Sequence, residues 1–302
     1  MAALTPMMAQ YMEVKNQYKD CILFYRLGDF YEMFFDDALT ASRELEITLT
    51  GRDCGQEERA PMCGVPYHAC DIYINKLIEK GYKVAICEQM EDPKLAKGLV
   101  KREVIRIVTP GTNMSQAILD ETRNNYLMCI FGCNEEYGLA VCDITTGEFR
   151  SCHVSSTAKL YDEINKYSPT EIIGNGAFLS CDLNFDYMKE KMKITISEAP
   201  SHYFNDDTCE DFIKRQFKVG SIDGLGIEDD QEDILISVGA LLQYLHETQK
   251  NSLDHINRMD VYSIEDYMII DSSSRRNLEL TETLRDLSLI HISEPTRLLS
   301  IS

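Results

Sequence analysis

The feature that most constrains the fold is an alternation of short apolar runs with stretches of helical periodicity, which occurs before residue 112 and again after residue 125. Residues 21–27 form a short apolar run that favours a buried strand. Residues 37–46 follow, with Ala38, Ala41 and Leu45 at helical spacing. Because a helix buries an apolar stripe and a strand an apolar face, this alternation predicts helices packed on sheets. We therefore expect the α/β class, with two mixed α/β domains.

The first unit is expected over residues 1–112. Thr5-Pro6 is typical of a helix start, with a capping hydroxyl followed by proline in the first turn. A later helix is predicted over residues 68–80, with Ile72, Leu77 and Ile78 facing inward. Strands are predicted at residues 47–50, 83–88 and 103–109, and loops at 51–60 and 63–68.

The second unit is expected over residues 125–250, after a polar, turn-prone linker at 113–124. It opens with three predicted strands, at residues 125–132, 137–143 and 147–154. A fourth strand at 171–174 then lies among helices predicted at 158–167, 204–217 and 231–249. Strands followed by interleaved helices again predict an α/β arrangement.

The charge is uneven along the chain, and its total is −20. Residues 1–115 carry 14 Lys and Arg against 17 Asp and Glu, a net of −3, whereas residues 116–302 carry 16 against 33, a net of −17. This total argues against a general nucleic-acid binder, which is normally basic. A local basic stripe is nevertheless predicted at residues 76–106, with Lys76, Lys80, Lys83, Lys94, Lys97, Lys101, Arg102 and Arg106.

Several classes of protein are not indicated. No apolar run approaches the roughly 20 residues that span a bilayer, and the amino terminus does not have the pattern of a secretory signal, so a cytoplasmic protein without membrane partners is expected. The 11 cysteines contain no C-x-x-C pair, which predicts neither a disulfide framework nor a metal site. The phosphate-binding motif G-x-x-x-x-G-K-[ST] is also absent from the sequence, so no ATP chemistry and no resident cofactor are expected of these residues.

Residues 28–34 place an aromatic ring and a carboxylate two positions apart. If the segment is extended, Phe30 and Glu32 share one face while Tyr31 and Met33 point the opposite way. An exposed ring can wedge between stacked bases, and a carboxylate beside it can bond to a base edge. Since a core phenylalanine next to a solvated acid is common on strands, the spacing alone does not assign this function.

Longer motifs decide between these interpretations. They resemble, in order and spacing, the MutS family of bacterial DNA mismatch-repair proteins. Five blocks carry the resemblance near the amino terminus: residues 5–8 (TPMM), 24–32 (FYRLGDFYE), 61–69 (PMCGVPYHA), 84–89 (VAICEQ) and 105–112 (IRIVTPGT). It continues through residues 143–149 (DITTGEF), 241–244 (LLQY) and 274–280 (SRRNLEL).

The resemblance implies a mismatch-recognition domain over residues 1–112 and an RNase H-like connector domain over 125–250. Residues 251–286 would then begin a truncated helical core, and 287–302, which depart from the family pattern, are expected to be a non-native tail. The full-length parent would be a homodimeric ATPase that uses ATP and Mg²⁺. Its acidic connector would dock a MutL-type repair partner.

The resemblance also implies that Phe30 stacks on a mispaired base in double-stranded DNA and that Glu32 bonds to that base. Phosphate contacts are expected from cations and backbone amides nearby, which makes Arg52 and Arg106 candidates. The segment at residues 63–68 combines freedom at Gly64 with rigidity at Pro66, which suits close approach to a groove. Its residues Gly64, Val65, Pro66 and His68 complete the predicted site, although His68 is equally consistent with a local role at a helix start.

Two other functions remain open from sequence. Asp143 ends a predicted strand and, with Glu148 or Glu171, could hold Mg²⁺ for phosphodiester cleavage as in an RNase H-like nuclease. Alternatively, the acidic second unit could be a module that docks repair partners without chemistry of its own.

Overall fold

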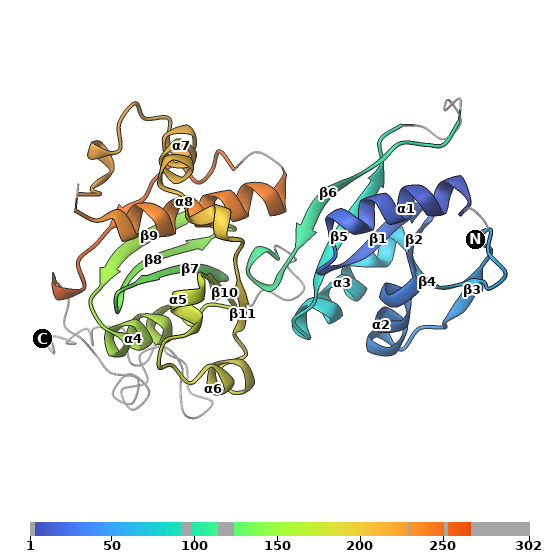
Figure 1. Cartoon of the computed structure of the whole chain (residues 1–302), viewed down its shortest axis with the longest axis horizontal. Helices are drawn as coiled ribbons and strands as arrows, with labels where there is room; N and C mark the ends of the chain where they lie inside the picture. The colour runs from blue at the N-terminus through green and yellow to red at the C-terminus, as the bar shows by residue number, and fades with distance from the viewer. Residues whose placement is uncertain (1–3, 92–97, 114–123, 229, 251–252, 267–302) are drawn as a thin grey trace, which may run out of the picture.

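The computed structural model describes residues 4–91, 98–113, 124–228, 230–250 and 253–266. They form two units side by side, each a mixed sheet with helices on both faces (Figure 1), which confirms the α/β class. Residues 267–286 of the helical core expected at 251–286, the tail at 287–302 and nearly all of the linker at 113–124 lie outside the described residues.

The first unit is built on a sheet whose strand order is β3-β4-β2-β1-β5-β6. Strand β1 pairs antiparallel with β2 and parallel with β5, so the sheet is mixed as expected. The strands are β1 (Cys21–Leu27), β2 (Phe30–Phe34), β3 (Thr50–Arg52), β4 (Ala60–Pro66), β5 (Lys83–Gln89) and β6 (Arg102–Val108).

Helices cover both faces of this sheet (Figure 1). Helix α1 (Pro6–Gln17) packs on one face through Met8 and Tyr11. Helices α2 (Phe35–Leu45) and α3 (Cys70–Glu79) pack on the other, the latter after a short 3₁₀ turn, η1 (Tyr67–Ala69). Thr5 is the N-cap residue of α1, but its side chain makes no capping hydrogen bond.

The inward face of α3 differs from the prediction at one position. Leu77 and Ile78 are buried as predicted, whereas Ile72 is 61% exposed. Ile74, Leu77 and Ile78 have the i, i+3, i+4 spacing of one helix face, and Ile72 lies two residues, more than half a turn, away from Ile74. The prediction for Ile72 is therefore wrong.

The loop predicted at residues 51–60 is confirmed for 53–59, which connect β3 and β4, whereas the loop predicted at 63–68 is wrong at 63–66, which belong to β4. Strand β3 begins at Thr50 rather than at residue 47, and β4 occupies Ala60–Pro66 between β3 and β2. Pro61, Gly64 and Pro66 are residues that normally indicate loops. Here both prolines lie near the ends of β4, where strands tolerate them.

The second unit has the strand order β11-β10-β7-β8-β9-β12. Its first three strands form an antiparallel meander, and β10 and β11 extend it in parallel, which agrees with the RNase H-like connector that the resemblance implies. The strands are β7 (Tyr126–Cys133), β8 (Glu136–Asp143), β9 (Glu148–Val154), β10 (Glu171–Gly174), β11 (Thr195–Glu198) and β12 (Asp260–Val261). Strand β11 was not predicted.

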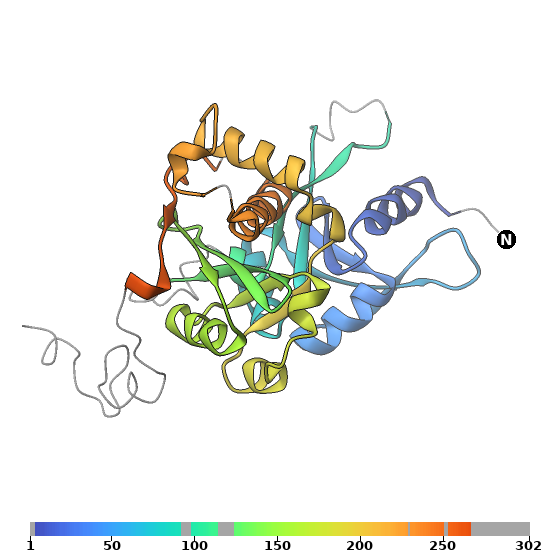
Figure 2. The same cartoon turned by 60° about the vertical axis from the view of Figure 1, so that its left-hand side comes forward.

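Two layers of helix cover this second sheet, as Figure 2 shows from another side. One face carries α7 (Asp206–Phe217) and α8 (Glu232–Gln249), and the other carries α4 (Thr157–Tyr167), α5 (Gly176–Leu179) and α6 (Phe185–Glu190). Besides η1, the described residues contain the 3₁₀ turns η2 (Pro110–Thr112), at the end of the first unit, and η3 (Ser201–Phe204), η4 (Asp223–Leu225) and η5 (Ile264–Asp266), in the second. Among the described helices, none is both long and apolar enough to cross a membrane.

A buried carboxylate joins the two units. Glu171, at the start of β10, accepts hydrogen bonds from Thr109 Oγ1 (2.5 Å) and the Gly111 amide (3.0 Å), both at the end of the first unit. Its other oxygen accepts a hydrogen bond from the Tyr244 hydroxyl on α8 (2.7 Å). Asn125 adds a bond from its side-chain amide to the Pro110 carbonyl (3.1 Å). This junction, named here the Glu171 junction, fixes the end of the first unit on the second.

Candidate nucleic-acid interface

A tight turn places Phe30 at the edge of the first unit. Leu27 and Phe30 are opposite each other in the β1–β2 pairing, so Gly28 and Asp29 form a two-residue hairpin loop. Gly28 has φ +57°, a conformation that glycine adopts without a steric penalty. Phe30 is therefore the first residue of a strand that is hydrogen-bonded on both sides, by β1 and β4.

The side chains of β2 alternate as an extended segment requires. Phe30 is 47% exposed, whereas Tyr31 and Met33 lie in the core with α2 and α3. Glu32 shares the outer face with Phe30. Further along that face Phe34 is covered by Tyr11 of α1, with 4.9 Å between the ring centroids. The aromatic ring open to solvent on β2 is therefore that of Phe30.

Glu32 is held by an arginine from the neighbouring hairpin. Its carboxylate forms an ion pair with the guanidinium of Arg52, the last residue of β3. Gly64 lies opposite Glu32 in the β2–β4 pairing, and a Cβ atom there would lie 3.4 Å from Glu32 Cγ. Gly64 thus leaves room for the carboxylate beside Arg52.

Two further predicted residues lie next to this face. Pro66 is paired with Phe30 in the sheet and is half-buried. His68 is exposed in η1, and its ring meets the ring of Tyr67 edge-on, with 5.7 Å between centroids. Together Phe30, Glu32, Arg52, Gly64, Pro66 and His68 form what we call the wedge surface.

Two predicted residues lie elsewhere. Val65 points to the opposite side of β4 and is buried in the core, so its side chain is not available to a ligand. Arg106 is on β6, the third strand along from β2, where its Nη2 donates to the Thr112 carbonyl (3.0 Å) and burial lowers its pKa. We therefore leave Val65 and Arg106 out of the wedge surface, because one belongs to the core and the other holds the end of the first unit.

The comparisons with known proteins place this geometry in a family. Residues 5–117 match the family model of MutS domain I, and residues 125–257 match that of MutS domain II. The chain belongs to the MutS family. The two matched segments correspond to the two structural units and are separated at the same place in the chain, although β12 of the second sheet lies beyond residue 257.

Individual relatives agree with the MutS models. The chain is 60% identical over 286 residues to the DNA mismatch repair protein MutS of Lachnoclostridium phytofermentans, 57% over 290 residues to that of Acetivibrio thermocellus and 53% over 292 residues to that of Ruminiclostridium cellulolyticum. Each alignment covers 95% of this chain but 31 to 33% of the relative. The chain thus spans about a third of the length of these MutS proteins.

Some residues that contact the turn carrying Phe30, outside the wedge surface, were not singled out from sequence. Arg26, Tyr67 and Glu88 lie directly beneath the turn that carries Phe30, and each belongs to a different one of the MutS-like blocks. The MutS-like blocks therefore already contained all three residues. Their convergence could not be seen, because it depends on which strands are neighbours in the sheet.

The basic stripe at residues 76–106 does not form one positive surface among the described residues. Lys80 pairs with Glu44 (3.0 Å) and Lys101 with Glu103 (2.5 Å), while Arg102 is buried. Lys94 and Lys97 lie outside the described residues. Carboxylates neutralise much of the stripe, so it does not by itself indicate a DNA-binding face.

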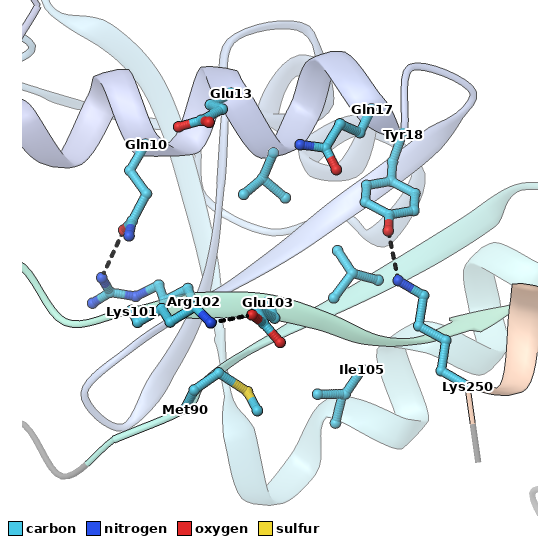
Figure 3. Close-up of a pocket in the computed structure, with 12 residues that line it drawn as sticks. Gln10, Glu13, Gln17, Tyr18, Met90, Lys101, Arg102, Glu103, Ile105 and Lys250 are labelled. Carbon is cyan, nitrogen blue, oxygen red and sulfur yellow. Dashed lines mark hydrogen bonds and ion pairs between the residues drawn. The ribbon is translucent and has the colours of Figure 1, made fainter. Parts of the chain in front are cut away.

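A cleft of about 710 Å³ lies where α1, β6 and the C-cap of α8 meet (Figure 3). Its polar groups bond to one another: Arg102 donates to Gln10 (3.1 Å) and Lys250 to the Tyr18 hydroxyl (2.6 Å). The described residues of the wedge surface do not line it. This cleft is therefore separate from the wedge surface.

The carboxylates considered for a nuclease are engaged in structural hydrogen bonds. Asp143 is fully buried and accepts from the Thr145 amide (2.8 Å) and hydroxyl (2.6 Å) and from the Asn125 amide (3.3 Å). Glu171 is equally buried in the Glu171 junction. Glu148 pairs with Arg150 (2.8 Å). Since both oxygens of Asp143 and of Glu171 already accept hydrogen bonds, we do not propose a nuclease.

Proposed function

We propose that this chain recognises mispaired or unpaired bases in duplex DNA, as part of DNA mismatch repair, by inserting Phe30 into the base stack and bonding Glu32 to a base. The observation that supports this most is the half-exposed ring of Phe30 at the first position of a strand, with Glu32 on the same face. The names of the similar proteins agree with it.

The wedge distinguishes mispaired from matched DNA because the two differ in the energy needed to separate their bases. Separating stacked bases costs on the order of a few kcal/mol per step, and this cost is lower where a base is already mispaired. A protein that imposes one geometry on every duplex therefore binds best where the duplex yields most easily, without reading its sequence.

Arg52 allows two states of the Glu32 carboxylate, one paired with the Arg52 guanidinium and one free to bond to a base. In the free protein the guanidinium of Arg52 neutralises the carboxylate of Glu32, and the Arg52 side chain remains 39% exposed. When DNA approaches, its phosphates compete for Arg52, because arginine binds phosphate through the same fork of N–H groups that binds a carboxylate. The carboxylate of Glu32 is then free to accept a hydrogen bond from a base.

The test is a titration of matched and mispaired duplexes with Phe30→Ala and Glu32→Ala variants of this chain. Because a base stacked on an aromatic side chain contributes about 1–3 kcal/mol, Phe30→Ala should reduce the preference for a mispair by roughly 5- to 160-fold. Glu32→Ala should weaken that preference more than it weakens general affinity. Tyr187→Ala is the matched control, since Tyr187 is equally exposed (48%) but lies on α6 of the second unit. Unchanged preference in Phe30→Ala would refute the proposal.

For the whole protein we propose the remaining features that the MutS resemblance implies. These are a homodimer on DNA, an ATPase that uses ATP and Mg²⁺ in parts beyond the described residues, a MutL-type partner docked on the connector, and a cytoplasmic location. The net negative charge of the second unit supports the proposal that a partner docks on it through charge. Partner binding that survives Phe30→Ala would assign that role to the connector independently of the wedge.

A further inference from the structure

Three segments that are far apart in the sequence meet beneath the turn that carries Phe30. They are the end of β1 with Arg26, the start of η1 with Tyr67 and the end of β5 with Glu88. Strand β1 lies between β2 and β5 in the sheet, so Arg26 can reach both the turn and Glu88. None of these three residues belongs to the wedge surface.

Arg26 contacts all the parts of this cluster. Its Nε donates a hydrogen bond of 2.6 Å to the Gly28 carbonyl, inside the turn. Its guanidinium carbon lies 3.7 Å from the centroid of the Tyr67 ring, and its Nη1 lies 3.5 Å from Glu88 Oε1. The side chain of Arg26 is mostly shielded from solvent. One planar group therefore bonds to the turn, stacks on an aromatic ring and pairs with an acid.

The second residue of the turn, Asp29, is also hydrogen-bonded to this cluster. The Tyr67 amide donates to the Asp29 carbonyl (3.0 Å), so the carbonyls of both loop residues, Gly28 and Asp29, are held. Glu88 is in turn positioned by the hydroxyl of Tyr31, which donates to it. Burial, and then this bond to Glu88, raises the pKa of Tyr31 well above its ordinary value, so the hydroxyl remains a donor.

We infer that Arg26 is a positioning residue for the Phe30 wedge, acting through the Gly28 carbonyl and the ring of Tyr67. This inference rests on the proposed function. A wedge separates bases only if its own backbone is stiffer than the base stack, and a two-residue hairpin loop has few contacts of its own. Arg26 and Tyr67 supply that stiffness, because together they hold both loop carbonyls against the sheet.

Arginine is specifically suited to this role. A guanidinium is planar and can stack on Tyr67 while its edge donates to Gly28 and Glu88. A lysine at this position keeps the charge but cannot stack and bond in several directions at once. Arg26→Lys therefore removes the positioning contacts of Arg26 while keeping its positive charge.

The experiment places 2-aminopurine beside a mispair and records its fluorescence, which rises when the base is unstacked, as this chain is added. Arg26→Lys and Arg26→Gln should lower the fluorescence rise at saturation at least threefold, and both should also lower the mispair preference measured by titration. Their far-ultraviolet circular dichroism should match that of the unsubstituted chain. Arg43→Gln is the control, since Arg43 is an exposed arginine on α2 that pairs with its neighbour Glu44.

A second pair of variants keeps the inference testable if Arg26 variants fold poorly. Tyr67 is 42% exposed, so its substitution does not open the core. Tyr67→Leu, which removes the stacking face, should reduce the fluorescence rise, whereas Tyr67→Phe, which retains that face, should preserve it.

The outcomes separate this inference from the proposed function. Phe30→Ala is measured in the same assay: if it preserves the fluorescence rise, the wedge itself is wrong. If Phe30→Ala abolishes the rise while folded Arg26→Lys and Tyr67→Leu retain it, the wedge stands and the positioning role of Arg26 is overturned. A lower thermal midpoint with an unchanged fluorescence rise would likewise show that Arg26 is only structural.

Discussion

At the scale of single residues, the position of the Glu32 carboxylate depends on the free space beside it. Gly64 lies opposite Glu32, and a Cβ atom at position 64 would lie 3.3 Å from the Tyr31 carbonyl oxygen and 3.4 Å from Glu32 Cγ. These distances are tight for one added atom, and the branches of valine extend further. A larger residue at 64 should therefore displace the carboxylate rather than the strand.

Gly64→Val is predicted to reproduce the effect of Glu32→Ala: weaker preference for a mispair with little change in affinity for matched DNA. Valine favours strands, so the free energy of unfolding should change by no more than about 1 kcal/mol. Titration with both duplexes checks the preference, and urea unfolding checks the stability. Gly98→Val is the matched control, because a Cβ atom there meets nothing within 4 Å. Full mispair preference in Gly64→Val would contradict the crowding argument.

The cysteines provide a second residue-scale prediction, because Cys133 is the exposed one of the 11. Burial raises the pKa of Cys63 and of Cys152 to about 12, so the fraction of reactive thiolate at pH 8 is very small at both. Iodoacetamide at pH 8 should therefore modify Cys133 first, as mass spectrometry of peptides would show. Cys133→Ser should remove the fast phase. Earlier modification of Cys63 or Cys152 would indicate that the cores open more readily than the packing implies.

At the scale of elements, strands with continuous apolar runs were predictable and strands built from loop-type residues were not. The bounds of β1 and β10 are as predicted, since apolar runs there end at turn residues. Strand β4 was missed because its pairing with β2 and β3, rather than its own composition, makes it a strand. Phe30 and Glu32 could be found locally, but the contacts of Arg26 with Tyr67 and Glu88 depend on the order of strands in the sheet.

The crossing of α7 and α8 allows a prediction about elements. A Cβ atom at Gly239 on α8 would lie 2.3 Å from Cys209 Cβ on α7, far inside van der Waals contact. Replacing glycine by alanine favours a helix by up to about 1 kcal/mol, whereas overpacking a core costs about 1–3 kcal/mol or more. The steric cost should dominate at so short a distance.

Gly239→Ala is therefore predicted to lower the free energy of unfolding by about 1–2 kcal/mol, measured with urea. The matched control is Gly220→Ala, at an exposed position where a Cβ atom meets nothing within 4 Å. Stabilisation by Gly239→Ala would mean that helix propensity outweighs packing and that α7 can move away from α8.

At the scale of the whole molecule, the two units meet at the Glu171 junction, away from the wedge surface. Residues of the wedge surface all belong to the first unit, whereas Glu171 and Tyr244 belong to the second. From sequence alone Glu171 is a possible metal ligand, because a carboxylate considered by itself is suited both to metal binding and to structural hydrogen bonds. Its burial against Thr109 and the Gly111 amide, which decides the matter, follows from the docking of two units and could not be predicted from one segment.

Glu171→Ala should therefore lower the stability of the chain without changing its recognition of mispairs. It leaves the Tyr244 hydroxyl and the Gly111 amide without their acceptor, and each unsatisfied buried group costs about 1–3 kcal/mol, while the Thr109 hydroxyl keeps its hydrogen bond to the Thr112 hydroxyl. We expect a lower unfolding free energy and faster hydrogen exchange at the Gly111 amide, with the ratio of affinities for mispaired and matched DNA unchanged. Glu198→Ala, at an exposed carboxylate on the neighbouring strand β11, should change none of these quantities. If Glu171→Ala instead abolishes the mispair preference while the chain remains folded, the second unit must help to place Phe30, and recognition would be a property of the junction rather than of the first unit by itself.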